Sequence, residues 1–581
     1  MPAIHRRFDY SVPAPLADRI RVGSRVRVQL HGRRVGAWVV EADVPPTPGV
    51  APKPLAASSG AGPPPSVVAL AEWAAWRWAG PLSSFLGTAS PTRVVDDRAP
   101  VRVGDVPTTV PASPGGGSVS LVDEALAGGD GPAVVRLAPA LDATLVVLEL
   151  VHRVGPAGVL VLAPSHARAA QVAARLRQAG APVSLLPDRW PEAATGAFAV
   201  VGTRAAAWAP IPALTAAVVL DAHDEAYREE RSPTWSAVDV TLERARRDGA
   251  PALLVSSCPP LTLTEGARLV TTTRAVERRG WPVVELVDRT GDDPRTGLFS
   301  ERMVRAVRAV LDGPEGTVVC ILNRTGRIRL LACGRCGALA RCSRCGGAVA
   351  QDEAAGGLVC RRCGEVRPAV CAECDATRLK ALRVGVTRAT EELSALTGTE
   401  AVEVTGASDR DTGRWARLVV GTEAALHRVA RAELAVFLDI DQHLLAPRFG
   451  AGEEALALLA RAAHLVGSRS GSGRLLVQTR LPDHETLQAA VHADPGRLAV
   501  PERALRQLLG LPPFGAVALL RGPGAAAFAQ GLAVDPAVEV ARVEDDRWMV
   551  RAPDHAIMAD ALAGVPRPAE RLRVEVDATE V

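Results

Sequence analysis

Eight of the ten cysteines in this chain form four C-x-x-C pairs between positions 333 and 374. This spacing lets two thiolates of one tight turn reach a single tetrahedral zinc ion, and two such pairs complete a structural site. Four pairs therefore predict a module that closes around two zinc ions. The eight residues are Cys333, Cys336, Cys342, Cys345, Cys360, Cys363, Cys371 and Cys374.

The order of the pairs also predicts how they share the metal. The two central pairs are joined by a loop of hairpin length, residues 346–359, which favours a nested arrangement. One expected ligand set is the central one, Cys342, Cys345, Cys360 and Cys363. The other is the outer one, Cys333, Cys336, Cys371 and Cys374.

Other uses of the paired cysteines are disfavoured. The N-terminal sequence MPAIHRRFDYSVP has no hydrophobic signal core, which argues against secretion and against disulfides. A redox C-x-x-C needs one pair and not four. A chaperone of the four-fold CxxCxGxG type needs a glycine pattern that is missing after these pairs. Cys258 and Cys320 stand alone in apolar, strand-like stretches and are predicted to be core residues.

The composition is that of a soluble, globular protein with several domains. A chain of 581 residues is too long for one core, and 48% hydrophobic with 23% charged residues is not a disordered composition. No apolar run approaches the length of a membrane span, since the best, positions 145–151, is short and contains Glu149. We expect a cytoplasmic protein of three or four domains with no membrane partner.

The charge is nearly balanced, so any affinity for nucleic acid must come from local patches. The net charge is +3, and the basic residues comprise 65 arginines with Lys53 and Lys380 as the only lysines. Between Arg324 and Arg388 there are 13 basic and 5 acidic residues, an excess of 8. Two four-thiolate zinc sites, each with a formal charge of about −2, lower this excess to about +4. The module is therefore predicted to be a phosphate-binding element.

The rhythm of apolar segments predicts a multidomain α/β chain. Residues 1–100 contain short β-like segments and a helical pattern over 66–78, and residues 101–118 read as a Pro/Gly-rich linker. Two runs of alternating strand-like and helical segments, 119–280 and 281–500, predict parallel α/β sheets, the second interrupted by the zinc-binding insertion 333–378. Residues 501–581 form a last unit, predicted as a small α+β domain.

The layout resembles the PriA family of primosomal replication restart proteins over nearly the whole chain. The eight-cysteine pattern is the most specific part, and its nested pairing is also that of the family. The other matching segments, in chain order, are Phe8-Asp-Tyr-Ser-Val-Pro, Gly23-Ser-Arg-Val-Arg-Val, Gly202-Thr-Arg-Ala-Ala, His223-Asp-Glu-Ala-Tyr, Leu322-Asn-Arg-Thr-Gly, Val384-Gly-Val-Thr-Arg-Ala-Thr-Glu-Glu-Leu, Gly421-Thr, Asp439-Ile-Asp and Leu511-Pro-Pro-Phe.

This resemblance implies a mostly-β N-terminal domain that captures the 3′ end of a nascent strand, followed by two RecA-like helicase lobes. The implied 3′-end pocket consists of Phe8, Asp9, Gly32 and Lys53. The aromatic ring would pack on the terminal nucleotide, and the Asp9 carboxylate would accept from the 3′-hydroxyl. The alternative is that Phe8 is a core aromatic and Asp9 a cap. A winged-helix domain that is usual in the family is missing.

The segment that corresponds to the phosphate-binding loop departs from the family. A P-loop needs Gly-x-x-x-x-Gly-Lys-Ser/Thr, because backbone N–H groups cradle the phosphates and the lysine reaches the β/γ oxygens. Here the segment is Arg136-Leu-Ala-Pro-Ala-Leu-Asp-Ala-Thr, without glycine, and no lysine occurs between Lys53 and Lys380. Arginine is not an equivalent point charge at that position.

Two further nucleotide motifs have also decayed. The family's DEEH becomes Leu220-Asp221-Ala222-His223, so that Leu220 replaces the magnesium-binding aspartate. The late motif QVAGRAGR reads His464-Leu-Val-Gly-Ser-Arg-Ser-Gly. We therefore expect no ATP cofactor, no catalytic residues and no motor activity. Asp221, His223 and Asp224 are interpreted as a vestigial nucleotide site, with a metal or acid–base site as the alternative.

Three classes of function compete. The first is a non-catalytic, nucleoid-associated scaffold that binds branched forks with a nascent 3′ end and nucleates primosome assembly. Its expected partners are other primosome proteins, the replicative helicase or its loader, and single-strand-binding protein. The second is an active ATP-dependent 3′-to-5′ DNA helicase, which the missing lysine argues against. The third is a zinc-ribbon protein of another class, such as a nucleic-acid chaperone, which the ordered match along the chain argues against.

Overall fold

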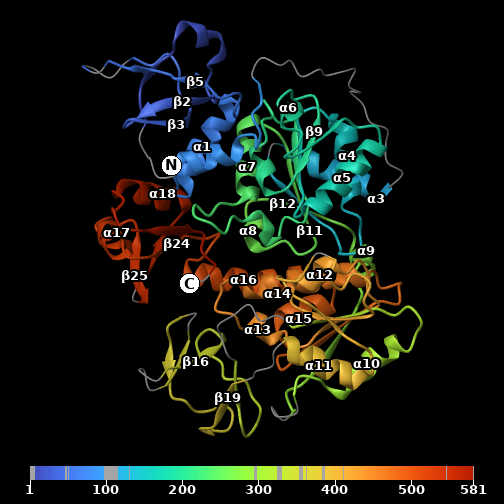
Figure 1. Ribbon diagram of the computed structural model, residues 1–581. Coiled ribbons are helices and arrows are strands. Elements are labelled where there is room, and N and C mark those ends of the chain that lie inside the picture. The colour runs from blue at the N-terminus through green and yellow to red at the C-terminus, as the bar shows by residue number, and fades with distance from the viewer. Residues whose placement is uncertain are drawn as a thin grey trace.

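The computed structural model describes residues 7–45, 49, 51–96, 116–129, 131–292, 297–322, 330–352, 357–360, 363–381, 386–409, 411–544 and 546–579 (Figure 1). Positions 101–115 of the predicted linker lie outside these residues, and helix α3 begins at Gly116, within the predicted linker. Parts of the segments that follow Leu322 and precede Val386 also lie outside them.

The N-terminal unit starts with a small three-stranded β-sheet, β3-β2-β5, while β1 and β4 form a separate two-stranded pair. Strand β2 alternates basic and apolar residues, so Val26 and Val28 are buried against Leu55 while Arg27 is exposed. The turn between β2 and β3 has positive φ at both His31 and Gly32 (47° and 77°), as a two-residue type I′ hairpin requires. The elements are β1 (Tyr10–Ser11), η1 (Ala14–Arg19), β2 (Arg25–Leu30), β3 (Arg33–Trp38), β4 (Lys53–Pro54) and β5 (Ala57–Ser58).

Two helices connect this sheet to the rest of the molecule, α1 (Pro65–Arg77) and α2 (Leu82–Ala89). Helix α1 has Pro65 at its first position, where the fixed φ of proline suits a helix start. It coincides with the helical pattern predicted over 66–78.

The first lobe, residues 116–279, is built on a seven-stranded parallel sheet with the order β12-β6-β11-β10-β7-β9-β8. Its central strands are wholly buried, because helices cover both faces. The elements are α3 (Gly116–Leu126), β6 (Ala133–Arg136), α4 (Thr144–Val154), β7 (Val159–Leu162), α5 (His166–Gln178), β8 (Val183–Leu185), α6 (Trp190–Ala193), β9 (Ala199–Gly202), η2 (Arg204–Trp208), β10 (Ala216–Val219), η3 (Glu225–Tyr227), α7 (Ala237–Asp248), β11 (Ala252–Ser256), α8 (Leu261–Thr264), β12 (Arg268–Thr271) and α9 (Arg274–Arg279).

The second lobe, residues 283–509, has a six-stranded parallel sheet with the order β13-β23-β22-β14-β21-β20. Helix α14 runs between the two lobes (Figure 1). The elements are β13 (Val283–Asp288), α10 (Glu301–Leu311), β14 (Val318–Ile321), α11 (Val386–Thr397), β20 (Val402–Val404), β21 (Leu418–Gly421), α12 (Ala424–Arg428), β22 (Leu434–Phe437), α13 (Asp441–Leu444), α14 (Ala451–Val466), β23 (Arg474–Thr479), α15 (Glu485–Val491) and α16 (Gly496–Leu509).

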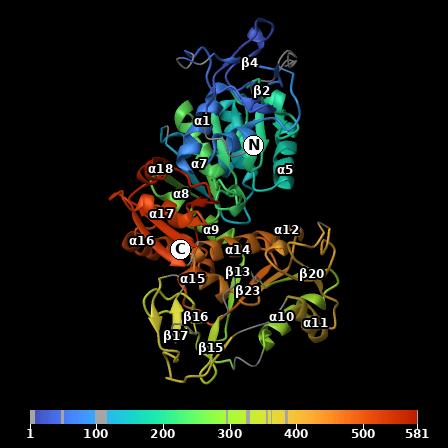
Figure 2. The same cartoon turned by 60° about the vertical axis from the view of Figure 1, so that its left-hand side comes forward.

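The cysteine module, residues 331–381, is inserted in the second lobe between β14 and α11 and lies at the side of this lobe (Figure 2). Strands β15 and β19 pair at its two ends, and β16, β17 and β18 form a separate antiparallel sheet. The elements are β15 (Leu331–Cys333), β16 (Val349–Asp352), β17 (Gly357–Cys360), β18 (Val366–Arg367) and β19 (Leu379–Ala381).

The C-terminal unit is a four-stranded antiparallel sheet, β25-β26-β24-β27, with two helices. Its elements are β24 (Ala516–Arg521), α17 (Ala525–Leu532), β25 (Glu539–Glu544), β26 (Arg547–Ala552), α18 (His555–Gly564) and β27 (Arg573–Val576). The predicted fold class is confirmed: a mostly-β N-terminus, two parallel α/β lobes, a cysteine-rich insertion and a small α+β C-terminal unit.

The N-terminal helices, the first lobe and the C-terminal unit share one hydrophobic core. Helix α18 lies beside α1 (Figures 1 and 2), and Trp76 Nε1 donates to the Asp560 carboxylate at 2.8 Å. Arg77 pairs with Asp577 at 2.9 Å, and His555 Nε2 lies 2.8 Å from the same carboxylate. These contacts attach helix α1 to the C-terminal unit. Within the described residues, none of the helices combines the length and the apolarity needed to cross a membrane.

Candidate functional sites

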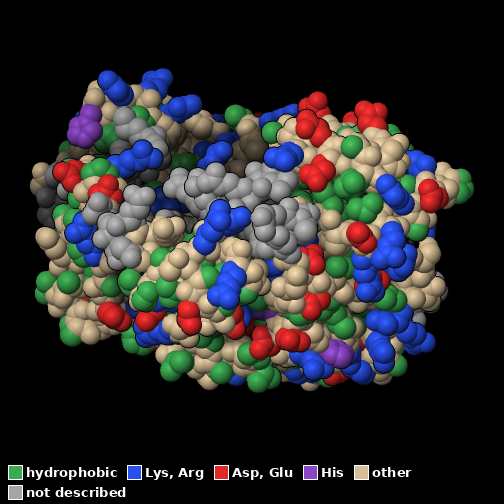
Figure 3. Space-filling view, turned by 90° about the horizontal axis from the view of Figure 1, so that it is seen from below, with side chains coloured by type: hydrophobic (Ala, Val, Ile, Leu, Met, Phe, Trp, Pro, Cys, Tyr) green, Lys and Arg blue, Asp and Glu red, His purple; other side chains and the backbone are tan. Residues whose placement is uncertain are grey.

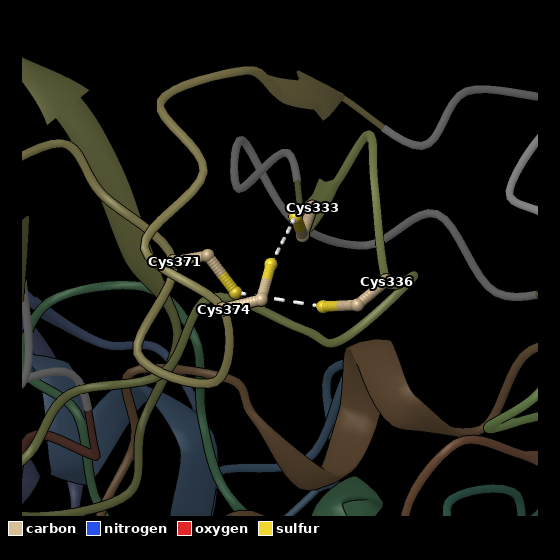
Figure 4. A group of neighbouring side chains, drawn as sticks. All are labelled: Cys333, Cys336, Cys371 and Cys374. Atoms are coloured by element: carbon tan, nitrogen blue, oxygen red, sulfur yellow. Dashed lines mark hydrogen bonds between the residues drawn. The ribbon is translucent and has the colours of Figure 1, made fainter.

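The eight paired cysteines form two groups of four. In the outer group, the Sγ atoms of Cys333 and Cys374 are 3.6 Å apart, as are those of Cys336 and Cys371. Figure 4 shows these four sulfurs pointing toward one another from two separate turns. In the inner group, the Cys342–Cys363 and Cys345–Cys360 distances are both 3.5 Å. Within each group all four sulfurs lie within 4.8 Å of one another.

This geometry fits a tetrahedral metal site. Four sulfurs at Zn–S distances of about 2.3 Å are about 3.8 Å from one another, close to the distances here. A disulfide would bring two sulfurs to about 2.05 Å. The four sulfurs of each group are therefore placed so that they could hold one metal ion, and the grouping is the nested one that the sequence indicates.

Each C-x-x-C pair is a tight turn that ends in a left-handed residue. The residues that follow the second cysteines are Gly337 (φ 76°), Gly346 (φ 69°), Gly364 (φ 74°) and Asp375 (φ 57°). The backbone N–H of each donates to the carbonyl of the first cysteine of its pair, at 2.9 to 3.1 Å. Glycine adopts this conformation without strain, and aspartate is among the few other residues that tolerate it. These four positions were not predicted from the sequence, although a glycine after three of the four pairs was a visible signal.

The cysteine module is fastened to the second lobe. Arg480 donates to the Gly337 carbonyl at 3.3 Å, and the Ala348 N–H donates to the Leu445 carbonyl at 3.2 Å. Leu330 and Ala348 pack with Leu445 in a small apolar cluster.

The surface charge is mixed on the face of the molecule seen from below, where Lys and Arg side chains are interspersed with Asp and Glu (Figure 3). Arg335, Arg341 and Arg344 of the module are exposed.

The structure brings three of the four predicted 3′-end residues to the two-stranded parallel sheet β1-β4, which is separate from the three-stranded sheet β3-β2-β5. Strands β1 and β4 pair in parallel, with Tyr10 opposite Lys53, so Phe8 and Asp9 directly precede the strand beside Lys53. The Phe8 side chain is 46% exposed, which is not the burial of a core aromatic. Phe8 and Asp9 line a hollow of about 1530 Å³ between the sheet and helices α1 and α2.

The fourth predicted residue, Gly32, lies in the β2–β3 turn. A Cβ atom placed on it would meet nothing within 4 Å, so its positive φ and not a close contact accounts for the glycine. Neither Gly32 nor Lys53 lines the hollow that contains Phe8 and Asp9.

The segment at the position of a P-loop, residues 136–144, is a compact turn between β6 and α4. The Thr144 N–H, at the start of α4, donates to Asp142 Oδ1 at 2.9 Å, and Arg175 donates to Asp142 Oδ2 at 3.2 Å. Burial alone would raise the pKa of the Asp142 carboxyl, but the bonds from Thr144 and the guanidinium groups of Arg175 and Arg168 lower it below its ordinary value. An internal carboxylate thus occupies the anion position at this helix terminus.

The same segment is also covered by the second lobe. His464 Nδ1 donates to the Pro139 carbonyl at 2.6 Å. Ala138, only 2% exposed, belongs to the hydrophobic core of the second lobe, and Leu141 packs against that core. The Arg469 N–H donates to the Arg279 carbonyl at 3.0 Å. The late segment 464–471 is therefore engaged in contacts with backbone and apolar groups of the first lobe.

His223 and Asp224 have different side-chain partners, and Asp221 has a left-handed backbone conformation (φ 49°). Leu220, which replaces the expected magnesium ligand, is fully buried, and its carbonyl accepts from the Tyr227 hydroxyl at 2.5 Å. His223 Nδ1 lies 2.8 Å from Ser256 Oγ, and burial lowers the pKa of His223 although Asp221 and Asp224 oppose this. Asp224 contacts Arg461 of the second lobe.

These three residues do not form a metal site. Among the residues that the structure describes, only the two cysteine groups bring three or more potential metal ligands together. Cys258 and Cys320 are buried, and burial raises the pKa of each thiol to about 12. Both are therefore unreactive core residues, as predicted.

Comparison with known proteins identifies relatives of the whole chain. Residues 1–91 match the family model of a 3′ DNA-binding domain. Proteins named probable replication restart protein PriA, from Mycobacterium bovis and Mycobacterium tuberculosis, are 31% identical over 98% of this chain and 91% of their own length. The replication restart protein PriA of Bacillus subtilis is 26% identical over 55% of this chain and 43% of its own length.

Proposed function

Because this chain belongs to the PriA family of replication restart proteins, we propose that it recognises stalled or branched replication forks and nucleates primosome assembly without hydrolysing ATP. The observation that carries the fork-binding part is the exposed Phe8 beside Asp9 in a domain that matches a 3′ DNA-binding model. The lobes, the cysteine module and the C-terminal unit then hold this domain in position on the fork.

The binding chemistry of the proposed 3′-end pocket follows from the exposed Phe8 and Asp9 and from the neighbouring Lys53. The Phe8 ring offers an aromatic face on which a terminal base can stack. The Asp9 carboxylate is an acceptor for a 3′-hydroxyl proton, and it would repel a 3′-phosphate. Lys53 lies on β4, opposite Tyr10 of β1, and adds positive charge near the backbone of the bound DNA strand.

For the cysteine groups we propose zinc as the metal, one ion in each group. Four thiolates in tetrahedral geometry, without an open position, are typical of structural zinc. Cys333, Cys336, Cys371 and Cys374 would hold one ion, and Cys342, Cys345, Cys360 and Cys363 the other. The metal would fix the four turns of the module against the second lobe.

The absence of ATP hydrolysis is supported by what fills the nucleotide position. The Asp142 carboxylate sits at the α4 terminus where a phosphate would bind, and it would repel phosphate oxygens. Ala138 and Leu141 are packed against the second lobe, and no lysine of the first lobe can reach the site. An active helicase remains the second candidate, because the chain keeps both lobes of its family.

We extend the proposal to partners and location by family membership. The partners would be other primosome proteins, the replicative helicase or its loader, and single-strand-binding protein. The protein would act on the nucleoid in the cytoplasm.

The fork-binding proposal is tested with matched forks that carry a free or a phosphate-blocked nascent 3′ end. Wild-type protein should bind the free end more tightly, and Asp9→Ala should remove that preference while leaving affinity for the blocked end unchanged. Asp18→Ala, in the same domain, is the control and should keep the preference. An equal loss on both forks for Asp9→Ala would instead assign Asp9 a structural role.

A further inference from the structure

One face of the β2–β3 hairpin turns arginines away from the core. In the antiparallel register Arg27 is opposite Gly36, and Gln29 is opposite Arg34. Directly opposed residues share a face, so these four lie on one side and the buried Val26 and Val28 lie on the other. Arg27, Gln29, Arg34 and Gly36 are all exposed.

The arginines of this face are used in two different ways. Arg25, at the base of the hairpin, donates to the carbonyls of Ala61, Pro91 and Arg93 at 3.1 to 3.2 Å and serves the fold. In the part of the chain that the structure describes, the side chains of Arg27 and Arg34 form neither a hydrogen bond nor an ion pair. Two guanidinium groups on paired strands are therefore exposed to solvent. The repulsion between their like charges is unfavourable.

Gly36 has no side chain, so the exposed face of the hairpin is flat at this position. A Cβ atom built on Gly36 would lie 4.0 Å from Arg27 Nη1, so the guanidinium lies over a strand position without a side chain. Arg27 and Gly36 also line the hollow that contains Phe8 and Asp9. Arg27 therefore borders the same space as the two proposed 3′-end residues, and Arg34 lies on the same face of the hairpin but does not line the hollow.

We propose that Arg27 and Arg34 bind the last internucleotide phosphates of the DNA strand whose 3′ end is held at Phe8 and Asp9. The two arginines are diagonal neighbours across the strand pair, about 7–8 Å apart, which is comparable with the spacing of successive phosphates along a strand. Arginine is suited to this role because its planar fork binds two phosphate oxygens at once. This inference rests on the proposed 3′-end function and adds the residues that hold the backbone.

The test measures binding of full-length protein to forks over a range of salt concentrations, with wild type and Arg27→Gln/Arg34→Gln. Losing two phosphate contacts should lower the salt slope by about 1.4, at about 0.7 per phosphate on a single strand. The loss of affinity should be equal for free and blocked 3′ ends. In wild type, neutral methylphosphonates at the last two linkages should weaken binding about tenfold or more, and the double variant should show no further loss.

Arg33→Gln is the matched control, because Arg33 is the exposed neighbour of Arg34 but lies on the opposite face. It should keep the wild-type salt slope. An unchanged slope in the double variant, an equal drop in Arg33→Gln, or full sensitivity of the double variant to methylphosphonates would overturn the inference. If the wild-type protein binds free and blocked ends with equal affinity, the proposed 3′-end function is contradicted instead. The salt slope would then test only whether the two arginines bind phosphates.

Discussion

The Asp142 carboxylate accepts a hydrogen bond from the Thr144 backbone N–H at 2.9 Å, at the point where α4 begins. The bond gives one free N–H group of the helix terminus an internal partner. Arg175 lies 3.2 Å from the other carboxylate oxygen, Oδ2, and Arg168 lies 3.9 Å from Oδ1. This arrangement gives the turn of residues 136–144 a structural role.

A first prediction follows for stability. Replacing Asp142 by Ala should lower the free energy of unfolding by about 1 kcal/mol, as the loss of a capping carboxylate does. Because the folded-state pKa of Asp142 is below its unfolded value, this contribution is present above the unfolded pKa and lost as pH falls through the folded one. Denaturant titrations at pH 7 and at acid pH should therefore show the difference from wild type shrinking on acidification. A constant difference would mean that the carboxylate charge is not what stabilises the turn.

A second prediction concerns the metal content. Elemental analysis of the purified protein should find two zinc ions per chain, and Cys342→Ser should retain one. Cys320→Ala, which changes a cysteine outside the pairs, is the control and should retain two. Since structural zinc supplies folding free energy, chelation should unfold the module. A metal-free protein whose module is still folded would refute the zinc assignment.

The left-handed residues after the pairs give a third prediction. Gly364→Ala places a Cβ at φ 74° and should make the inner ion easier to remove by a chelator, with a strain of about 1 kcal/mol. Asp375→Gly, at the equivalent position of the outer site, should hold its ion at least as tightly as wild type. The rate of zinc loss to a chelator measures both. The reverse order of sensitivity would show that backbone strain does not govern these turns.

A fourth prediction concerns the junction between α1 and the C-terminal unit. Burial alone would raise the pKa of Asp577, but Arg77 and His555 lower it far below its ordinary range. Asp577→Asn should destabilise the protein by about 3 kcal/mol, because it leaves the buried Arg77 without its counter-charge. The Arg77–Asp577 ion pair should stabilise the fold at neutral pH, and this stabilisation should be lost only in strong acid, where Asp577 becomes protonated. Glu575→Gln removes the partner of Arg573, whose side chain is far more exposed than that of Arg77, and should cost under about 1 kcal/mol in the same thermal unfolding assay.

The sequence predicted those features that depend on local pattern. The nested cysteine groups followed from the C-x-x-C spacing and loop length, and the parallel sheets followed from alternating apolar and helical segments. The lack of a lysine near residues 136–144 was also visible. These features need only neighbours along the chain.

Features that depend on contacts between distant segments were not predictable. Nothing in the sequence showed that His464 would bind the Pro139 carbonyl, or that Asp577 would meet Arg77, because these pairs are brought together by the packing of separate units. The sequence places Asp142 in the segment 136–144, but its bond to Thr144 depends on the backbone geometry of the turn. That Arg27 and Arg34 share one face likewise became apparent only from the hairpin register.

The central claim is that this chain binds forks without turning over ATP, and a DNA-stimulated ATPase assay tests it most directly. Phosphoryl transfer depends on a lysine, a magnesium ion held by an acid and a glycine-rich cradle, and loss of a single preorganised donor already costs roughly 10²–10³ in rate. The account predicts ATP turnover at background, with or without fork DNA, in a preparation that binds the same fork. Fork-stimulated turnover above background, abolished by a substitution within residues 136–144, would contradict it.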